Sequence, residues 1–132
     1  SIIREPLAGQ EAILPVPETL RHGHASPRSA VGFLIHAANI DGAKVGPRRN
    51  LSMPSVSVTV AEQIEALKRV AGEKVAARIK RVPDPVVARI VTNWAEEVEA
   101  RRARELGFTV EKNFDEIIRV HIEDELGGKI AD

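Results

Sequence analysis

The sequence predicts a fold of the α/β class, or α+β if the chain stands alone. Segments with apolar residues at helical spacing alternate with short apolar or alternating runs, and capping residues, glycines and prolines separate the two kinds. The 132 residues suffice for one core of ordinary size. We therefore expect helices and short strands in alternation, without internal repeats.

The N-terminal part of the chain carries three expected elements. Ile2–Leu7 is a short helical piece, and Ala12–Pro17 is an extended edge segment because its prolines cannot donate hydrogen bonds. Ser26 and Pro27 are typical of a helix start, since Ser accepts bonds from free N–H groups and Pro suits the first helical position. The helix that follows, to about Ile40, is apolar nearly all round, which predicts that it lies between other layers of a larger body.

The middle of the chain offers one clear helix and two candidate strands. Asn50–Met53 is a short apolar run between turn residues and is expected to be a buried strand. Ser55–Val60 alternates valines and could be another strand. However, Thr59 and Glu62 are spaced as a capping box, so we expect a helix over Val60–Ala71.

The C-terminal part is expected to hold one more strand and three helices. Lys74–Val82 alternates apolar and basic residues, which predicts a half-buried strand. Val86–Trp94 follows a Pro-Asp-Pro turn as a short apolar helix, and Glu97–Leu106 is a charged helix. Asn113 begins a last capped helix, which ends at Gly127.

Composition excludes several classes of function. The 19 Lys and Arg residues balance 19 Asp and Glu residues, so no basic field attracts nucleic acid or an anionic membrane, and we expect neither partner. The absence of Cys removes disulfides, thiolate nucleophiles and Cys-rich zinc sites, and it fits a cytoplasmic protein. No apolar run approaches the ~18 residues of a membrane span. Phosphate-binding glycine loops are also missing from the sequence.

Few residues carry a recognisable chemistry. His22 and His24 could share a face and hold a metal, but no third ligand stands near them in sequence, so we expect no metal site. The segment from Arg21 to Arg28 gathers guanidinium and imidazole groups at a helix start, and Arg81 precedes a proline turn. Both settings favour anions, although ordinary surface arginines beside a capped helix would give the same pattern.

Several motifs in colinear order resemble the C-terminal part of the extended short-chain dehydrogenases/reductases, the group that includes the UDP-sugar epimerases. The resemblance covers essentially all 132 residues. The motifs that carry it are Arg21-x-x-His24-x-Ser26-Pro27-Arg28, Asn50-Leu51, Arg81-x-x-Asp84 and Glu105-Leu106-Gly107-Phe108. More narrowly, the segments that resemble the D-erythronate dehydrogenase branch are Ile3–Gln10, Leu14–Pro17 and His24–Val31.

The resemblance implies a longer parent enzyme. Members of this family bind NAD or NADP in an N-terminal Rossmann domain and use Ser, Tyr and Lys for hydride transfer. This chain has no Tyr and no glycine-rich dinucleotide loop, and it begins at Ser1 without Met. We therefore expect a fragment that is inactive alone, with the cofactor and the catalytic residues in a missing N-terminal domain.

The resemblance also implies a set of substrate-binding residues. Arg21 matches an arginine of the family, and Arg81 and Asp84 match its later Arg-x-Gly-Asp motif; in the epimerases both arginines face the nucleotide diphosphate. Near Arg28 the family has an Asp, and a cation in its place suits a small sugar acid such as D-erythronate. A nucleoside-diphosphate-sugar epimerase and a free-standing anion-binding module remain as alternatives. The expected substrate-binding residues are Arg21, His24, Ser26, Arg28, Arg81 and Asp84.

The family fold predicts a division of the chain into three parts. Residues 1–20 begin the substrate region, and residues 21–55 return to the Rossmann body with the apolar helix and the strand at Asn50–Met53. Residues 56–132 form the C-terminal substrate-binding subdomain. Without its sheet the apolar helix would be exposed, so we expect self-association of the isolated chain and a homo-oligomeric parent.

Overall fold

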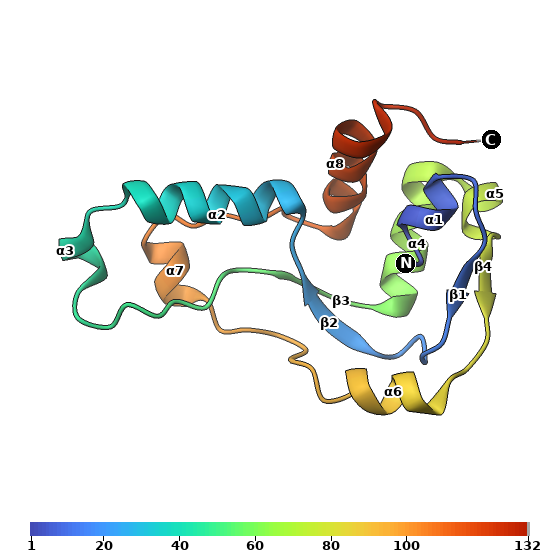
Figure 1. Cartoon of the computed structure of the whole chain (residues 1–132), viewed down its shortest axis with the longest axis horizontal. Helices are drawn as coiled ribbons and strands as arrows, with labels where there is room; N and C mark the ends of the chain where they lie inside the picture. Colours follow the sequence, from blue (N-terminus) through green and yellow to red (C-terminus); the bar gives the residue numbers. More distant parts are fainter. Residues whose placement is uncertain (132) are drawn as a thin grey trace.

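Two separate two-stranded sheets and the helices around them form the fold in a computed structural model, which describes residues 1–131 (Figure 1). The elements, in chain order, are α1 (Arg4–Leu7), β1 (Ala12–Leu14), β2 (Arg21–His24), α2 (Pro27–Asn39), α3 (Gly42–Val45), β3 (Val56–Thr59), α4 (Val60–Ala71), α5 (Glu73–Ala76), β4 (Ile79–Arg81), α6 (Pro85–Val91), α7 (Arg101–Glu105) and α8 (Phe114–Leu126).

The two sheets differ in direction and position. β1 pairs in parallel with β4, with Ala12 opposite Ile79 and Leu14 opposite Arg81. β2 pairs antiparallel with β3 in a four-residue ladder that runs from Arg21 opposite Thr59 to His24 opposite Val56. β2 leads into α2, and β3 passes directly into α4 (Figure 1). The β2–β3 pair therefore connects the start of α2 to the main helical core.

The main core lies where α4 and α8 pack against each other and against the β1–β4 pair. α4 begins at the predicted capping box, in which the Thr59 side chain accepts from the Glu62 N–H and the Glu62 side chain accepts from the Thr59 N–H. Asn113 caps α8 by accepting the Glu116 N–H, while the Glu116 side chain accepts the Lys112 N–H. The large apolar side chains buried in this core include Leu7, Leu14, Ile64, Leu67, Ile79, Phe114 and Ile118.

A second, smaller cluster holds α2 to the rest of the chain. Ala100, Ala103 and Phe108 are its buried members, and Phe33 of α2 packs against them. His36 of α2 also faces this cluster, with its ring edge-on to Phe108 and its Nε2 2.7 Å from the Leu106 carbonyl.

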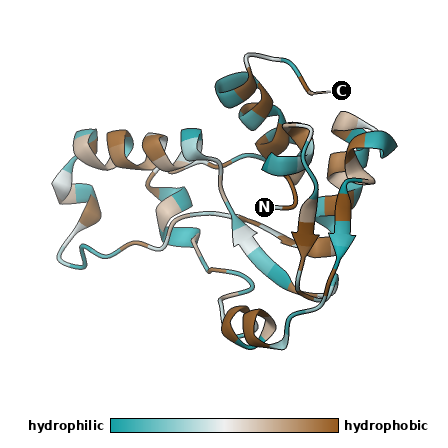
Figure 2. Cartoon of the chain, turned by 45° about the vertical axis from the view of Figure 1, so that its right-hand side comes forward, coloured by the Kyte–Doolittle hydropathy of each residue, from teal (hydrophilic) through white to brown (hydrophobic). Residues whose placement is uncertain are grey.

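Most other residues of α2 are exposed, and none is buried. Its most exposed apolar side chains are Val31, Leu34 and Ile35, with 54%, 73% and 60% of their surface accessible. Figure 2 shows hydrophobic colouring over most of the turns of α2.

The expected strand at Asn50–Met53 is wrong within the described residues. A strand needs a neighbour to accept and donate its backbone hydrogen bonds, and no strand of residues 1–131 lies beside this segment. Leu51 and Met53 instead pack, half-buried, against the smaller cluster.

Two further elements are shorter than expected. Residues 74–76 of Lys74–Val82 belong to α5, and only Ile79–Arg81 forms a strand. Val75 and Ala76 are adjacent and both buried, as a strand facing one core would not allow. α7 lacks the N-terminal part of the expected Glu97–Leu106 helix. There the Glu99 side chain accepts the Arg101 N–H at 2.6 Å, which starts the helix late.

Candidate functional site

Arg21 lies at the start of β2, and both terminal nitrogens of its guanidinium form hydrogen bonds within the chain. Its Nη1 donates to the Ser57 carbonyl at 2.9 Å, and its Nη2 donates to Glu62 Oε2 at 3.0 Å. The pKa of Glu62 is lowered, chiefly by the hydrogen bond from the Thr59 N–H and further by Arg21. The Arg21 guanidinium therefore lies against a fixed carboxylate at the start of α4.

His24 lies at the end of the same strand, where β2 meets both core helices. Its ring meets the Phe114 ring edge-on, with 5.2 Å between the centroids. Its Nε2 lies 3.2 Å from the Gln63 amide nitrogen and accepts from it, because an amide nitrogen can only donate. Burial lowers the pKa of His24, and the charge of His22 lowers it further, so the imidazole is neutral near pH 7.

Ser26 is the buried cap of α2, with 1% of its surface exposed. Its Oγ accepts the Ser29 N–H at 3.0 Å and donates to Glu111 Oε1, while its own N–H donates to Glu111 Oε2 at 3.4 Å. Burial raises the pKa of Glu111, but the bonds from Ser26 and Ser29 outweigh it and the net shift is downward. The anion-attracting end of α2 thus already holds a carboxylate of this chain.

Arg28, in the first turn of α2, reaches across to α8. Its Nε and Nη2 contact Asp124 at 3.1 and 2.6 Å, and Nη2 also contacts Glu123 at 3.0 Å. The pKa of Asp124 is lowered by these bonds. Within residues 1–131, Nη1 of Arg28 forms no hydrogen bond or ion pair, and half of the side chain is exposed.

Arg81 and Asp84 occupy the other sheet. Arg81 ends β4 and pairs through Nε with Glu18 Oε1. Asp84 caps α6 by accepting the N–H groups of Val86 and Val87 at 2.8 and 3.3 Å. The predicted residues thus form two groups, one along β2 and α2 and one after β4. No hydrogen bond or ion pair between described side chains joins the two groups directly.

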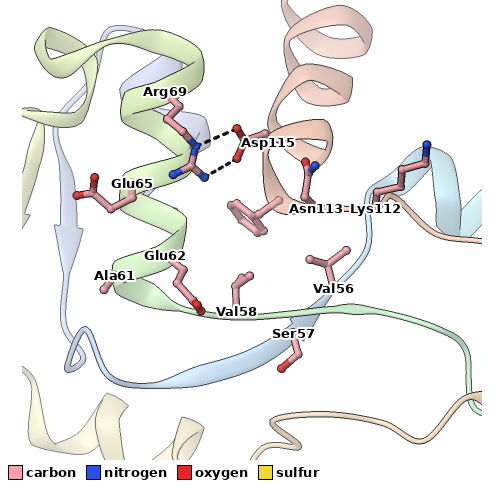
Figure 3. A pocket seen from close by; sticks show the side chains of 11 residues that line it. Val56, Ser57, Val58, Ala61, Glu62, Glu65, Arg69, Lys112, Asn113 and Asp115 are labelled. Atoms are coloured by element: carbon pink, nitrogen blue, oxygen red, sulfur yellow. Dashed lines mark hydrogen bonds and ion pairs between the residues drawn. The ribbon is translucent and has the colours of Figure 1, made fainter.

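Two grooves flank β3. The first, of about 560 Å³, lies between α4 and the start of α8, with Val56, Val58 and Ala61 among its apolar lining (Figure 3). At its edge the Arg69 guanidinium binds both oxygens of Asp115, at 2.7 and 3.1 Å (Figure 3).

The second groove, of about 600 Å³, lies between β3, α7 and the segment before α8. Its polar lining residues are Ser55, Ser57, Glu97, Arg104, Thr109, Glu111 and Lys112. Sequence reasoning missed this groove because its walls come from three segments that lie far apart in the sequence, and no local pattern shows that they meet.

The remaining candidates have structural partners. The His22 Nε2 lies 2.9 Å from the Val91 carbonyl, and its ring lies 5.5 Å from that of Trp94, which ties α6 to β2. Within residues 1–131, no three His, Cys, Asp or Glu side chains gather as a metal site would require. None of the described helices has the length and apolar character needed to cross a membrane.

Two solved structures share the fold of this chain over part of their own length. The crystal structure of a nucleoside-diphosphate-sugar epimerase from Agrobacterium tumefaciens superposes with a TM-score of 0.96 and 68% identity over 98% of this chain and 38% of that chain. An L-threonine dehydrogenase from Clostridium difficile shares the fold at a TM-score of 0.79 and 18% identity, over 98% of this chain and 40% of that chain. The expected α/β fold of Rossmann-type family members over part of their length is therefore confirmed.

Comparison with curated proteins points to particular relatives. No known family profile matches the chain. It is 43% identical to the D-erythronate dehydrogenase of Cupriavidus necator and 36% identical to that of Haemophilus influenzae, over 93% of this chain in each case. It spans 38% and 39% of the length of these relatives. The predicted resemblance to the C-terminal part of extended short-chain dehydrogenases/reductases is confirmed.

Proposed function

We propose that this chain is the C-terminal, substrate-binding part of an NAD(P)-dependent cytoplasmic oxidoreductase that acts on a small sugar acid resembling D-erythronate. The observation that carries the proposal is the 43% identity to a D-erythronate dehydrogenase over 123 residues. In this proposal an N-terminal Rossmann domain outside the chain binds NAD or NADP and supplies the Ser, Tyr and Lys residues for catalysis. The chain alone is then inactive.

The described residues contain no glycine-rich turn that could bind NAD or NADP. Dinucleotides bind where a glycine-rich turn leads from a strand into a helix. The turn from β2 into α2 is His24-Ala25-Ser26-Pro27, and its helix end is filled by the Glu111 carboxylate. Residues 1–131 therefore do not fit NAD(P) on their own, and we derive no hydride transfer from them.

The ion pairs of two arginines support a sugar acid over a nucleotide sugar. Arg21 is paired with Glu62, and Arg81 is paired with Glu18. A diphosphate that approached these guanidinium groups would also meet both carboxylates. Like charges at such short range oppose binding, whereas a small monoanion can bind elsewhere on the surface.

The exposed side of α2 supports the proposed division of the chain. In this proposal residues 21–55 pack on the Rossmann domain, residues 1–20 begin the substrate region, and residues 56–132 form the substrate-binding subdomain. Val31, Leu34 and Ile35 would form the contact, because three largely exposed aliphatic side chains on one helix are unusual in a free surface.

Arg28 offers the sharpest test of the predicted substrate-binding residues. Its free Nη1 could reach a substrate carboxylate while Asp124 holds the other edge of the guanidinium. In the longer enzyme that we propose, Arg28→Ala should raise the KM for D-erythronate about tenfold or more, because a bond to a charged group is lost.

The matched control is Asp124→Asn, which keeps the guanidinium and removes one charge that competes for it. This variant should leave the KM unchanged or lower it. An unchanged KM in Arg28→Ala would remove Arg28 from the substrate site, and an equal rise in both variants would mean that Arg28 only fastens α2 to α8.

A nucleotide-sugar epimerase remains the second candidate, because the 68% identical structure carries that name. The third is a free-standing module that binds anions. A thermal-shift comparison of D-erythronate with UDP-glucose separates the first two, since only the matching ligand should raise the melting temperature. Coding sequence upstream of Ser1 for a glycine-rich loop and a Tyr-x-x-x-Lys pair would exclude the free-standing module.

A further inference from the structure

We propose that the second groove beside β3, lined by Ser55, Ser57, Arg104, Thr109 and Lys112, binds the carboxylate and hydroxyl groups of a small polyhydroxy acid. This inference rests on the proposed function, because it names the place in this chain where such an acid binds. The groove measures about 600 Å³, within the range of ordinary small-molecule sites.

The cations of this groove are available for a ligand. Arg21, Arg28, Arg69 and Arg81 each form a salt bridge within the chain. Among residues 1–131, neither the Arg104 guanidinium nor the Lys112 ammonium lies within salt-bridge distance of a carboxylate. These two cations face the groove from α7 on one side and from the segment before α8 on the other.

The two carboxylates of the groove do not cancel this charge. Glu111 is held by the N–H and hydroxyl of Ser26, so its oxygens are directed to the start of α2. Glu97 lies on the exposed segment before α7. The exposed Glu97 carboxylate can accept hydrogen bonds from a ligand's hydroxyl groups, and the two cations can bind its carboxylate. The lining therefore suits a ligand that carries both groups.

Hydroxyl groups line the wall that β3 provides. Ser57 donates its hydroxyl to the Glu96 carbonyl at 2.7 Å, which leaves its oxygen free to accept from a ligand. Gly23 pairs with Ser57 in the ladder and also lies close to Ser55, because a Cβ on Gly23 would come within 2.6 Å of the Ser55 Oγ. The glycine on β2 thus leaves the space that the Ser55 hydroxyl occupies.

The groove is held in shape before any ligand arrives. β3 is fixed by its ladder with β2. On the opposite side Phe108 is buried in the smaller cluster, and Glu111 is bound to Ser26. A binding surface whose backbone is already fixed loses little conformational entropy when the ligand binds.

The test is a titration of the ¹⁵N-labelled chain with D-erythronate, followed by the amide shifts of residues 55–57 and 109–112. Arg104→Gln and Lys112→Gln should each weaken binding about tenfold, since each removes a charge-assisted bond. Arg101→Gln is the matched control: it lies on the same helix, is exposed, and does not line the groove. Erythritol, which lacks the carboxylate, should bind at least tenfold more weakly.

Two results of the titration would overturn this assignment. One is binding that Arg104→Gln and Lys112→Gln leave unchanged, which would move the acid to another site while the proposed function stands. The other is no shift in the groove amides of the unaltered chain, since all of the lining belongs to this chain. The sugar-acid activity is judged separately, by the thermal-shift comparison of D-erythronate with UDP-glucose. In the longer enzyme, a KM that rises in Arg28→Ala but not in Arg104→Gln would assign the carboxylate to Arg28 and would also overturn the assignment to the groove.

Discussion

At the residue scale, the chain satisfies most of its predicted anion-binding groups internally. Sequence reasoning found the cations at Arg21, Arg28 and Arg81 because they stand in recognisable motifs. It could not find their acidic partners, because Arg28 and Asp124 lie 96 positions apart and meet only when α8 packs beside α2. A local pattern reports which charges are present, and the tertiary fold decides which of them remain free.

The interaction between the Ser26 and Glu111 side chains can be measured as a coupling free energy in a double-mutant cycle. Ser26→Ala should lower the free energy of unfolding by about 1–3 kcal/mol, because it removes a helix cap and the hydroxyl that donates to the Glu111 carboxylate. Glu111→Gln should cost less. Urea unfolding of both single variants and the double variant gives the coupling, and strictly additive costs would show that the two side chains act independently.

His24 predicts a pH dependence of stability. Its pKa is lowered by burial in the folded chain, while in the unfolded chain it is close to the ordinary 6.5. The unfolded state therefore binds a proton first as pH falls. The stabilisation is complete above about pH 6.5 and is lost as pH falls toward the folded value. The urea midpoint of the unaltered chain should fall as the pH is lowered from about one unit above to about one unit below 6.5, the ordinary pKa of His. In His24→Gln the midpoint should stay nearly constant over the same range.

At the element scale, capping residues predicted the structure better than alternation did. Ser26, Thr59 and Asn113 each begin a helix where the sequence indicated, because a cap is a local hydrogen bond. The apolar run at Asn50–Met53 and the alternation over most of Lys74–Val82 both misled, although the alternating valines of Ser55–Val60 did form β3. A strand depends on a distant partner, and a short alternating run fits a helical turn equally well.

Two isoleucines distinguish the core helix from the outlying one. Ile118 of α8 is fully buried, whereas Ile90 of α6 has 56% of its surface exposed. Ile118→Ala should cost about 2–5 kcal/mol through the cavity that it leaves. The matched variant Ile90→Ala should change stability by less than about 0.5 kcal/mol. Similar costs by calorimetry would mean that α6 belongs to the core of the isolated chain.

At the scale of the whole molecule, the apolar side of α2 governs the behaviour of the isolated chain. Length and composition indicated a self-sufficient core, and the motif order gave the family, but neither could reveal which surface stays uncovered. That depends on how far the small cluster around Phe108 reaches along α2. It reaches Phe33 and Ile40 but leaves Leu34 exposed.

Self-association follows from this surface. The isolated chain should form concentration-dependent oligomers, and Leu34→Lys should weaken them at least tenfold by placing a charge in the apolar contact. Light scattering over a dilution series measures the change. Val86→Lys, which alters the exposed apolar side of α6 instead, is the control and should leave the oligomers intact. A chain that stays monomeric at every concentration would contradict the prediction.

The contact between Trp94 and His22 gives the protein a built-in optical probe. The sequence has one Trp and no Tyr, so its near-ultraviolet fluorescence comes almost entirely from a single indole. That indole lies beside the His22 ring just after α6, with 59% of its surface exposed. Any partner domain that covers α6 will dehydrate it and shift its emission to shorter wavelengths. Association of this chain with a second protein can therefore be followed without a label.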